Sequence, residues 1–278
     1  MPDHERKLYV AIGDSFTEGV GDWNKQLPNG VRGWADRVAE QLAKDSPGWQ
    51  YANLAVRSKR MRHIIADQLE PAVAMNPTLI TLYAGGNDIM DLGTSMEKLM
   101  ADYRWMAKRL AATGARLVLF TGYNVKVSLL LEPLKKRNAY FNEQVRAIAK
   151  ETGALLLDYE TFTEYEDRRM WGDDRLHMSK AGHKYLAHRV LKLLGVKDSI
   201  KLTLFEPPER RSLRQRAAEQ RQWINDWVLP LMGRKVRGVT MGDHLTARWP
   251  RPVTVPKKGG LRKLAKKQRK AERARRAA

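Results

Sequence analysis

The stretch LYVAIGDSFTEG at residues 8–19 decides how this chain folds. Its first half is a short apolar run rich in residues that favour β-strands, and a tight polar turn containing Ser15 follows it. Similar apolar runs recur as YANLAV, LITLYAG, RLVLFTG and ALLLDY. Between them lie stretches with apolar residues at helical spacing, at residues 31–44, 60–75, 96–113, 134–151 and 179–194. The alternation predicts an α/β fold with a central parallel sheet covered by helices.

Polar residues follow the predicted strands at the ends where parallel sheets form their ligand sites. Ser15 follows the first strand, Asn53 and Ser58 flank the end of the second, and GGND at residues 85–88 ends the third. We therefore expect these loops to meet at one edge of the sheet and to form the functional site there.

The composition is that of a folded protein whose 278 residues, 43% of them hydrophobic, can bury a full core. The chain has no cysteine, which excludes disulfides, thiolate metal sites and a cysteine nucleophile. The first apolar run begins too early to leave room for a cleavable signal, and no run approaches the ~20 residues of a membrane span. We expect a soluble cytoplasmic protein, with secretion by another route left open.

A serine hydroxyl is a poor nucleophile unless a base removes its proton, so a nucleophilic Ser15 needs a histidine. Of the six histidines, only His177 has an aspartate three residues before it, in the run WGDDRLHMS. Asp174 would fix the tautomer of the ring and stabilise its positively charged form. We predict these three residues as a catalytic triad. No group of histidines and acids has metal-ligand spacing, so we expect neither a metal nor another cofactor.

Acyl transfer also needs hydrogen-bond donors directed at the developing oxyanion. Asn87, at the end of LITLYAGGND, offers a side-chain amide, and the two preceding glycines allow the backbone to approach the site closely. A purely turn-forming role of this loop stays open as the alternative.

Over about residues 5–195 the chain resembles the SGNH, or GDSL-type, hydrolases. GDSFTEG matches the first block of that family with Ser15, GGND the third with Asn87, and DRLH the last with Asp174 and His177. The resemblance implies a flavodoxin-like three-layer α/β/α fold with the nucleophile on the first strand. It also implies an oxyanion hole made of the Ser15 backbone N–H, a backbone N–H in the second block and the Asn87 side chain.

The second block departs from the family pattern. The family usually places glycine five residues after the asparagine of this block, whereas this sequence has Ser58 there. The backbone donor survives the change only if the local φ and ψ suit a residue with a Cβ. Arg57, Lys59 and Arg60 surround this position, and we leave open whether they favour acidic substrates or form a solvated basic loop.

The net charge of +20 is concentrated at the C-terminus. Residues 207–278 hold 21 Lys and Arg against 5 Asp and Glu, a net +16. We predict an SGNH hydrolase domain at residues 1–206, a basic helical extension at 207–256 that packs on or near it, and a disordered basic tail at 257–278. The extension offers a helix at about 209–229, which either packs its Trp face on the domain or binds a membrane or partner. The charge predicts salt-sensitive, non-specific contact with nucleic acid or an anionic membrane.

The function that we expect is that of a serine esterase or lipase that cleaves carboxylic esters through an acyl-enzyme. Acyl transfer to a sugar or lipid alcohol by the same residues stays open, as does a non-catalytic protein that its basic C-terminus holds to nucleic acid or membrane. Nothing in the sequence identifies the ester. Trp23, Trp34 and Tyr123 lie in or beside loops near the predicted site, and we expect them to line an apolar substrate pocket.

Overall fold

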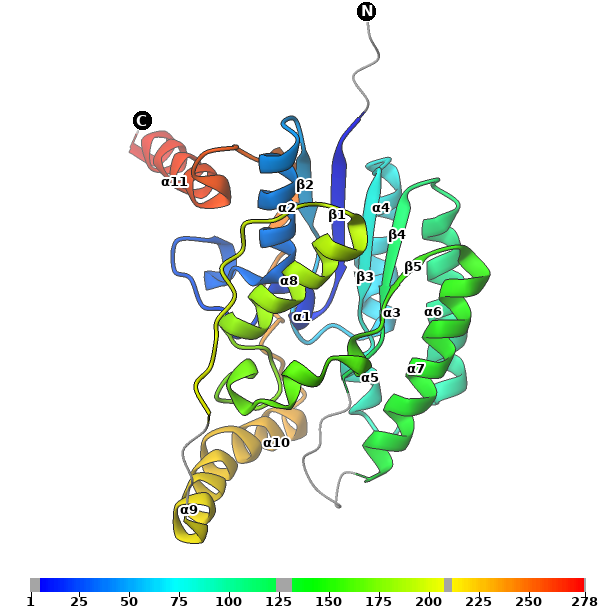
Figure 1. The fold of residues 1–278 in the computed structure, drawn as a ribbon, viewed down its shortest axis with the longest axis vertical. Helices are drawn as coiled ribbons and strands as arrows, with labels where there is room; N and C mark the ends of the chain where they lie inside the picture. Colours follow the sequence, from blue (N-terminus) through cyan, green and yellow to red (C-terminus); the bar gives the residue numbers. More distant parts are fainter. Residues whose placement is uncertain (1–5, 124–131, 208–211, 278) are drawn as a thin grey trace, which may run out of the picture.

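The computed structural model describes residues 6–123, 132–207 and 212–277 of the chain. A six-stranded sheet with the strand order β5-β4-β3-β1-β2-β6 forms its centre (Figure 1). The strands are β1 Leu8–Gly13, β2 Gln50–Asn53, β3 Leu79–Tyr83, β4 Arg116–Phe120, β5 Leu155–Leu157 and β6 Trp249–Thr254. Strands β1 to β5 are parallel, and β6 pairs antiparallel with β2 at one edge. The predicted α/β fold with a parallel central sheet is confirmed.

Strand β1 lies inside the sheet because both of its faces are apolar. It is buried along its whole length and pairs with β2 on one side and β3 on the other. Its residues divide between two cores, with Tyr9 and Ala11 on one face and Val10 and Ile12 on the other. Strands buried on both faces read as unbroken apolar runs, which explains the LYVAIG pattern.

Helices cover both faces of the sheet and complete three layers (Figure 1). On one face α2 packs against α8, and Trp34 and Leu186 lie in the core beneath them. On the other face α3, η2, α4, α6 and α7 bury residues such as Tyr103 and Phe141. These helices are α2 Gly33–Asp45, α3 Met61–Ile64, η2 Ile65–Leu69, α4 Glu70–Ala74, α6 Met96–Ala111, α7 Glu132–Thr152 and α8 Lys180–Leu194.

Short helical segments fill most loops at the carboxyl edge of the sheet. They are α1 Ser15–Glu18, η1 Pro28–Gly30, α5 Gly86–Ile89, η4 Tyr159–Thr161, η5 Thr163–Glu166 and η6 Arg168–Met170. Among the described residues, no helix combines the length and apolar composition that crossing a bilayer requires.

The C-terminal part differs from the predicted division of the chain. It begins with the expected helix, formed by α9 Leu213–Trp223, the π turn η7 Ile224–Val228 and α10 Leu229–Val236. It then adds β6 to the sheet and buries Trp249 in the same core as Trp34, so the central sheet does not end at residue 206.

The segment at residues 257–278 was expected to be disordered, but it forms α11 Gly260–Ala277. Leu261 and Ala265 are buried in the core that α2 also lines, and the Leu261 backbone N–H donates to Glu40 of α2 at 3.1 Å. These contacts supply the apolar burial that a basic segment lacks in isolation.

Candidate active site

Ser15 begins α1, at the point where β1 ends. Gly13 makes the close turn with φ of +149°, and a Cβ at this position would lie 2.1 Å from the Tyr83 carbonyl oxygen. Asp14 caps α1 by accepting a hydrogen bond from the Phe16 backbone N–H at 3.1 Å. Ser15 is therefore held at the carboxyl edge of the sheet, as predicted from the sequence.

The loop before α8 brings His177 to Ser15. His177 Nε2 lies 2.8 Å from Ser15 Oγ, and Nδ1 lies 2.6 Å from Asp174 Oδ2. The other carboxylate oxygen of Asp174 accepts from the backbone N–H groups of Leu176 and His177 at 3.0 and 2.9 Å. The structure thus brings together the three residues that the sequence spacing selected.

The surroundings of Asp174 keep its carboxylate ionised. Burial opposes the charge, but the hydrogen bond from His177, its electrostatic attraction and the two backbone donors outweigh it, so the pKa of Asp174 lies below its usual value. A carboxylate in this position directs Nδ1–H toward itself and leaves Nε2 to accept a proton from Ser15.

Asn87 lies on α5, beside the same edge. Its side-chain amide donates to the Lys59 carbonyl oxygen at 3.0 Å and lies 3.5 Å from Asp14 Oδ2. Burial and the nearby charge of Asp88 raise the pKa of Asp14 to about 7, although its hydrogen bond from Phe16 opposes the shift. Asn87 is thus fixed by one strong bond, and its second contact is long.

Ser58, in the second block, has a left-handed backbone conformation with φ of +65°. This is a conformation in which glycine is at ease and a residue with a Cβ is strained. Within the described residues, the backbone N–H groups of Ser58 and Ser15 have no hydrogen-bond acceptor in the protein. Both donors remain available for a ligand.

The basic side chains around Ser58 all have acidic partners. The Arg57 guanidinium binds both carboxylate oxygens of Glu18 at 2.8 and 2.9 Å, and the Arg57 backbone N–H donates to the same carboxylate at 2.7 Å. Lys59 pairs with Asp67 and Arg60 with Asp91. These pairs favour a structural role over recognition of an acidic substrate, and the Arg57–Glu18 pair joins the second-block loop to α1.

The three residues expected to line a substrate pocket lie in different environments. Trp34 is 0% exposed and packs against Phe120 in the core, with ring centroids 5.1 Å apart, so its prediction as a pocket residue is wrong. An apolar residue on the buried face of α2 belongs to the core rather than to a loop. Trp23 is 61% exposed with the Arg57 guanidinium 5.9 Å from its ring centre, and Tyr123 is half-buried, 5.2 Å from the Trp171 ring.

Two residues that the sequence does not single out hold the chain on either side of Ser15. Gln68, in the π turn η2, accepts from the Gly13 backbone N–H and donates to the Gly13 carbonyl oxygen, both at 2.9 Å. Arg248, just before β6, donates to the Glu18 carbonyl oxygen at 2.9 Å and binds both carboxylate oxygens of Asp36. Gln68 lies in no motif that marks it in the sequence. Arg248 lies in the basic C-terminal segment, where an arginine is expected at the surface.

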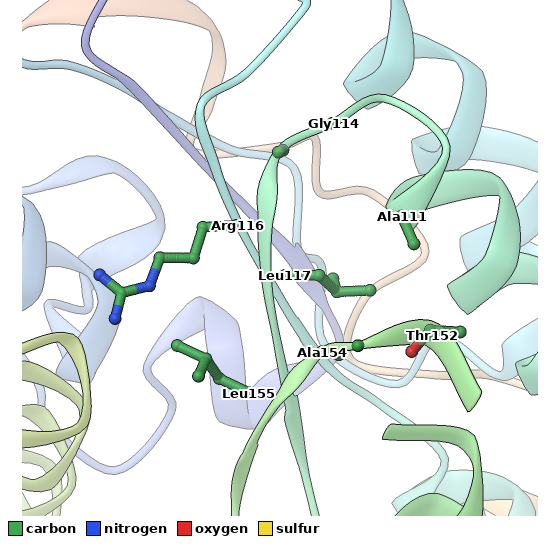
Figure 2. A pocket seen from close by; sticks show the side chains of 9 residues that line it. Ala111, Gly114, Arg116, Leu117, Thr152, Ala154 and Leu155 are labelled. Carbon is green, nitrogen blue, oxygen red and sulfur yellow. The ribbon is translucent and has the colours of Figure 1, made fainter. Parts of the chain in front are cut away.

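A hollow elsewhere on the molecule is separate from this site (Figure 2). It is lined by the turns before β4 and β5, with Arg116, Thr152 and Leu155 among its residues. These turns lie at the amino ends of the strands, opposite to the edge that carries Ser15. Among the described residues, no group of three or more histidines and acids is placed to hold a metal ion.

Comparison with known proteins identifies the family of the chain. The model of the GDSL-like lipase/acylhydrolase family matches residues 11–185. The chain belongs to this family. It is therefore a hydrolase of ester bonds, on the SGNH fold.

Similar proteins include an acetylxylan esterase from Geobacillus stearothermophilus, 28% identical over 214 residues, which cover 66% of this chain and 92% of that protein. The solved structure of Axe2, an acetylxylan esterase from the same organism, matches with a TM-score of 0.56 and 21% identity over 69% of this chain and 95% of that one. The psychrotrophic esterase EstA from Pseudoalteromonas matches with a TM-score of 0.56 and 15% identity over 68% and 97%. At these identities the structural matches show the fold alone.

Proposed function

We propose that the chain cleaves carboxylic esters through an acyl-enzyme on Ser15. The observation that carries the proposal is the continuous path of hydrogen bonds from Ser15 through both ring nitrogens of His177 to Asp174. Three structures of Axe2 are described as catalytic mutants, with alanine at a serine, an aspartate or a histidine, and there too the aspartate precedes the histidine by three positions. The likeness supports the same roles here.

Each residue has a defined role in the reaction. His177 Nε2 takes the proton of Ser15 Oγ while the oxygen attacks the ester carbonyl, and the ionised Asp174 stabilises the resulting imidazolium. The tetrahedral intermediate expels the alcohol, which takes the proton back from His177. Water then attacks the acyl-enzyme, again giving its proton to His177, and releases the acid and Ser15.

The oxyanion of the intermediate is held by three donors in this proposal: the Ser15 and Ser58 backbone N–H groups and the Asn87 amide. The two backbone groups have no acceptor among the described residues. The long contact between Asn87 and Asp14 is the weaker of its two bonds, so the oxyanion would replace that one and leave the bond to Lys59 in place.

The proposal is tested by substituting Ser15→Ala and measuring the turnover of short p-nitrophenyl esters. Loss of the nucleophile is expected to lower kcat at least about 10³-fold. Ser199→Ala is the control and is expected to leave kcat unchanged, because the Ser199 hydroxyl contacts Lys44 and Gln41 of α2. Unchanged turnover in Ser15→Ala would remove Ser15 as the nucleophile. A fluorophosphonate probe that fails to label the wild-type protein would favour the non-catalytic alternative, and a transferred acyl group on an added alcohol would favour acyl transfer.

Helix α11 supports a second proposal, that this end of the molecule binds nucleic acid. The helix holds nine Lys and Arg against one Glu and extends away from the sheet in Figure 1. Its buried residues, Leu261 and Ala265, lie near its start, and among its described side chains no large apolar one is exposed. Helices that lie in a membrane surface insert an apolar face, so a purely electrostatic ligand such as a phosphate backbone fits better.

Binding to a DNA duplex, compared with binding to anionic vesicles, tests this proposal. The full chain is expected to bind a 20-base-pair duplex with an affinity that falls steeply with salt, and a variant with glutamine at Lys266, Lys267, Arg269 and Lys270 is expected to lose most of that affinity. The matched control replaces Arg214 and Arg221 in α9, Arg234 in α10 and Arg237 just after α10 with glutamine. Equal losses in the two variants, or binding to phosphatidylglycerol vesicles without binding to the duplex, would contradict the proposal.

A further inference from the structure

A bridging segment, residues 213–242, connects the two loops that flank Ser15. Toward one end, Trp223 contacts the loop that carries Asp174 and His177. At the other end, the Gly242 backbone packs on the loop that carries Ser58, because a Cβ at Gly242 would lie 2.1 Å from the Arg57 carbonyl oxygen. Figure 1 shows α9 and α10 along the carboxyl edge of the sheet, on the same side as α1.

The contact of Trp223 is made with the backbone of Asp174 itself. Its indole N–H donates to the Asp174 carbonyl oxygen at 3.0 Å. The guanidinium of Arg175 lies 4.9 Å from the centre of the Trp223 ring and donates to Gln220, one turn earlier in α9, at 2.6 Å. Three separate interactions thus fix α9 to two consecutive residues of the loop.

This loop needs such support because its backbone is strained. Arg175 has φ of +56°, in the left-handed region that disfavours residues with a Cβ. The peptide group between Asp174 and Arg175 is the one whose carbonyl Trp223 binds. The indole N–H fixes the orientation of that peptide group and so restrains the strained backbone that carries the Asp174 carboxylate.

The chain itself is irregular where Trp223 lies. Trp223 is the last residue of α9, and the π turn η7 begins at the next residue. Single π turns inside helices are frequent at functional sites. The other π turn, η2, carries Gln68, which binds the backbone of Gly13 close to Ser15.

The family match and the similar proteins do not extend over the whole of this chain. The family match ends at residue 185. The alignment with the acetylxylan esterase spans 66% of this chain and 92% of the esterase. The bridging segment lies beyond the family match. The contact with Asp174 therefore comes from a part of the chain that the family model does not cover.

We propose that Trp223, at the end of α9, is a positioning residue for the Asp174–His177 pair. The inference rests on the proposed function, because it assumes that His177 acts on Ser15. Trp223 does not touch the reacting atoms and acts only through the backbone of Asp174.

The test compares Trp223→Phe with Trp227→Phe. Phenylalanine keeps the aromatic ring at residue 223 but removes the N–H, whereas Trp227 is on the next turn, 38% exposed, and serves as the matched control. The loss of one hydrogen bond is expected to lower kcat for p-nitrophenyl acetate about 3- to 10-fold, with KM and Tm close to those of the wild type. Trp227→Phe is expected to retain the wild-type kcat.

The pH profile separates positioning from a structural role. A loosened Asp174 carboxylate stabilises the imidazolium less, so the acid limb of the kcat/KM profile is expected to move to lower pH in Trp223→Phe. A fall in Tm with an unshifted profile would show that Trp223 only stabilises the fold, and an unchanged kcat would also overturn the proposal. Activity that survives Ser15→Ala would instead refute the proposed function, so the two failures are distinguishable.

Discussion

At the scale of single residues, Ser58 shows how a backbone donor can persist where the family has glycine. Its φ of +65° is the conformation a glycine would adopt there, and the N–H belongs to the backbone rather than to the side chain. The resemblance could name the position but not the dihedral angle, because the angle depends on how the Arg57–Glu18 pair holds the loop. The serine therefore lowers the stability of the fold but keeps the backbone N–H donor.

Substituting Ser58→Gly is expected to raise the free energy of unfolding by up to about 1 kcal/mol, since glycine avoids the left-handed strain but gains freedom in the unfolded chain. The kcat/KM for p-nitrophenyl acetate is expected to stay within about 2-fold of the wild type. Urea unfolding and initial rates provide the measurements. The β-branched variant Ser58→Val is the control and is expected to lower both quantities; a gain of stability in that variant would contradict the argument.

His183 provides a prediction of pH dependence. It is fully buried in α8, its Nε2 bonds the Val20 carbonyl oxygen at 2.9 Å, and burial lowers its pKa to about 4. The unfolded chain takes up this proton near pH 6.5, so the contribution of a neutral His183 to stability is present above that pH. It is lost as the pH falls toward 4, by about 3 kcal/mol in total.

The variant His183→Gln keeps an N–H for Val20 and cannot titrate. Its stability is expected to fall less than that of the wild type between pH 6.5 and pH 4.5, as measured by urea unfolding at each pH. Asp14 acts in the opposite direction, because its raised pKa of about 7 makes the fold less stable as the pH rises. Parallel stability curves for the variant and the wild type would exclude His183 as the source of the slope.

At the scale of elements, α1 is a helix of four residues that the rest of the molecule must hold. Gln68 fixes the strand before it, Arg57 binds the side chain of Glu18, and Arg248 binds the Glu18 carbonyl oxygen. The positions of β1 and Ser15 could be predicted from local patterns. These three supports could not, because they join residues between 39 and 230 positions apart and each looks ordinary in its own segment.

Arg248 is the support with the largest expected effect. It is 3% exposed and pairs with Asp36, which is fully buried. Burial raises the pKa of Asp36 although Arg248 and the Tyr51 hydroxyl oppose the shift. Removing Arg248 leaves a buried carboxylate without its counter-charge, a change that costs about 3–5 kcal/mol in comparable cases.

The variant Arg248→Met is expected to lose that amount of stability at pH 8 and less at pH 5, where Asp36 can protonate in the fold. Adding Asp36→Asn is expected to recover part of the loss at pH 8, because an amide carries no charge to compensate. Chemical unfolding of both variants at the two pH values tests this. If the double variant were as unstable as the single one at pH 8, lost packing rather than an unpaired charge would explain the effect.

At the scale of the whole molecule, the division at residue 206 that composition suggested does not coincide with a structural boundary. The excess of positive charge in residues 207–278 is real, but charge reports the surface, whereas Arg248, Trp249 and Leu261 from this part are buried. Nothing in the sequence of residues 1–206 indicates that β6, from the C-terminal part, pairs with β2. Residues 207–278 are therefore part of the same fold as residues 1–206, although their composition differs.

Two truncated chains distinguish a completed fold from an appendage. A chain that ends at residue 206 lacks β6, Trp249 and Arg248, which leaves β2 as an edge strand and Asp36 without its partner. It is expected to lose cooperative thermal unfolding and esterase activity together.

A chain that ends at residue 256 keeps β6, Trp249 and Arg248 and loses only α11, with the burial of Leu261 worth about 2–3 kcal/mol. It is expected to show a lower Tm with nearly unchanged kcat and no salt-sensitive binding to a DNA duplex. Circular dichroism melting, ester turnover and duplex binding measure these outcomes, and an active 206-residue chain with the wild-type Tm would restore the boundary that the charge distribution suggested.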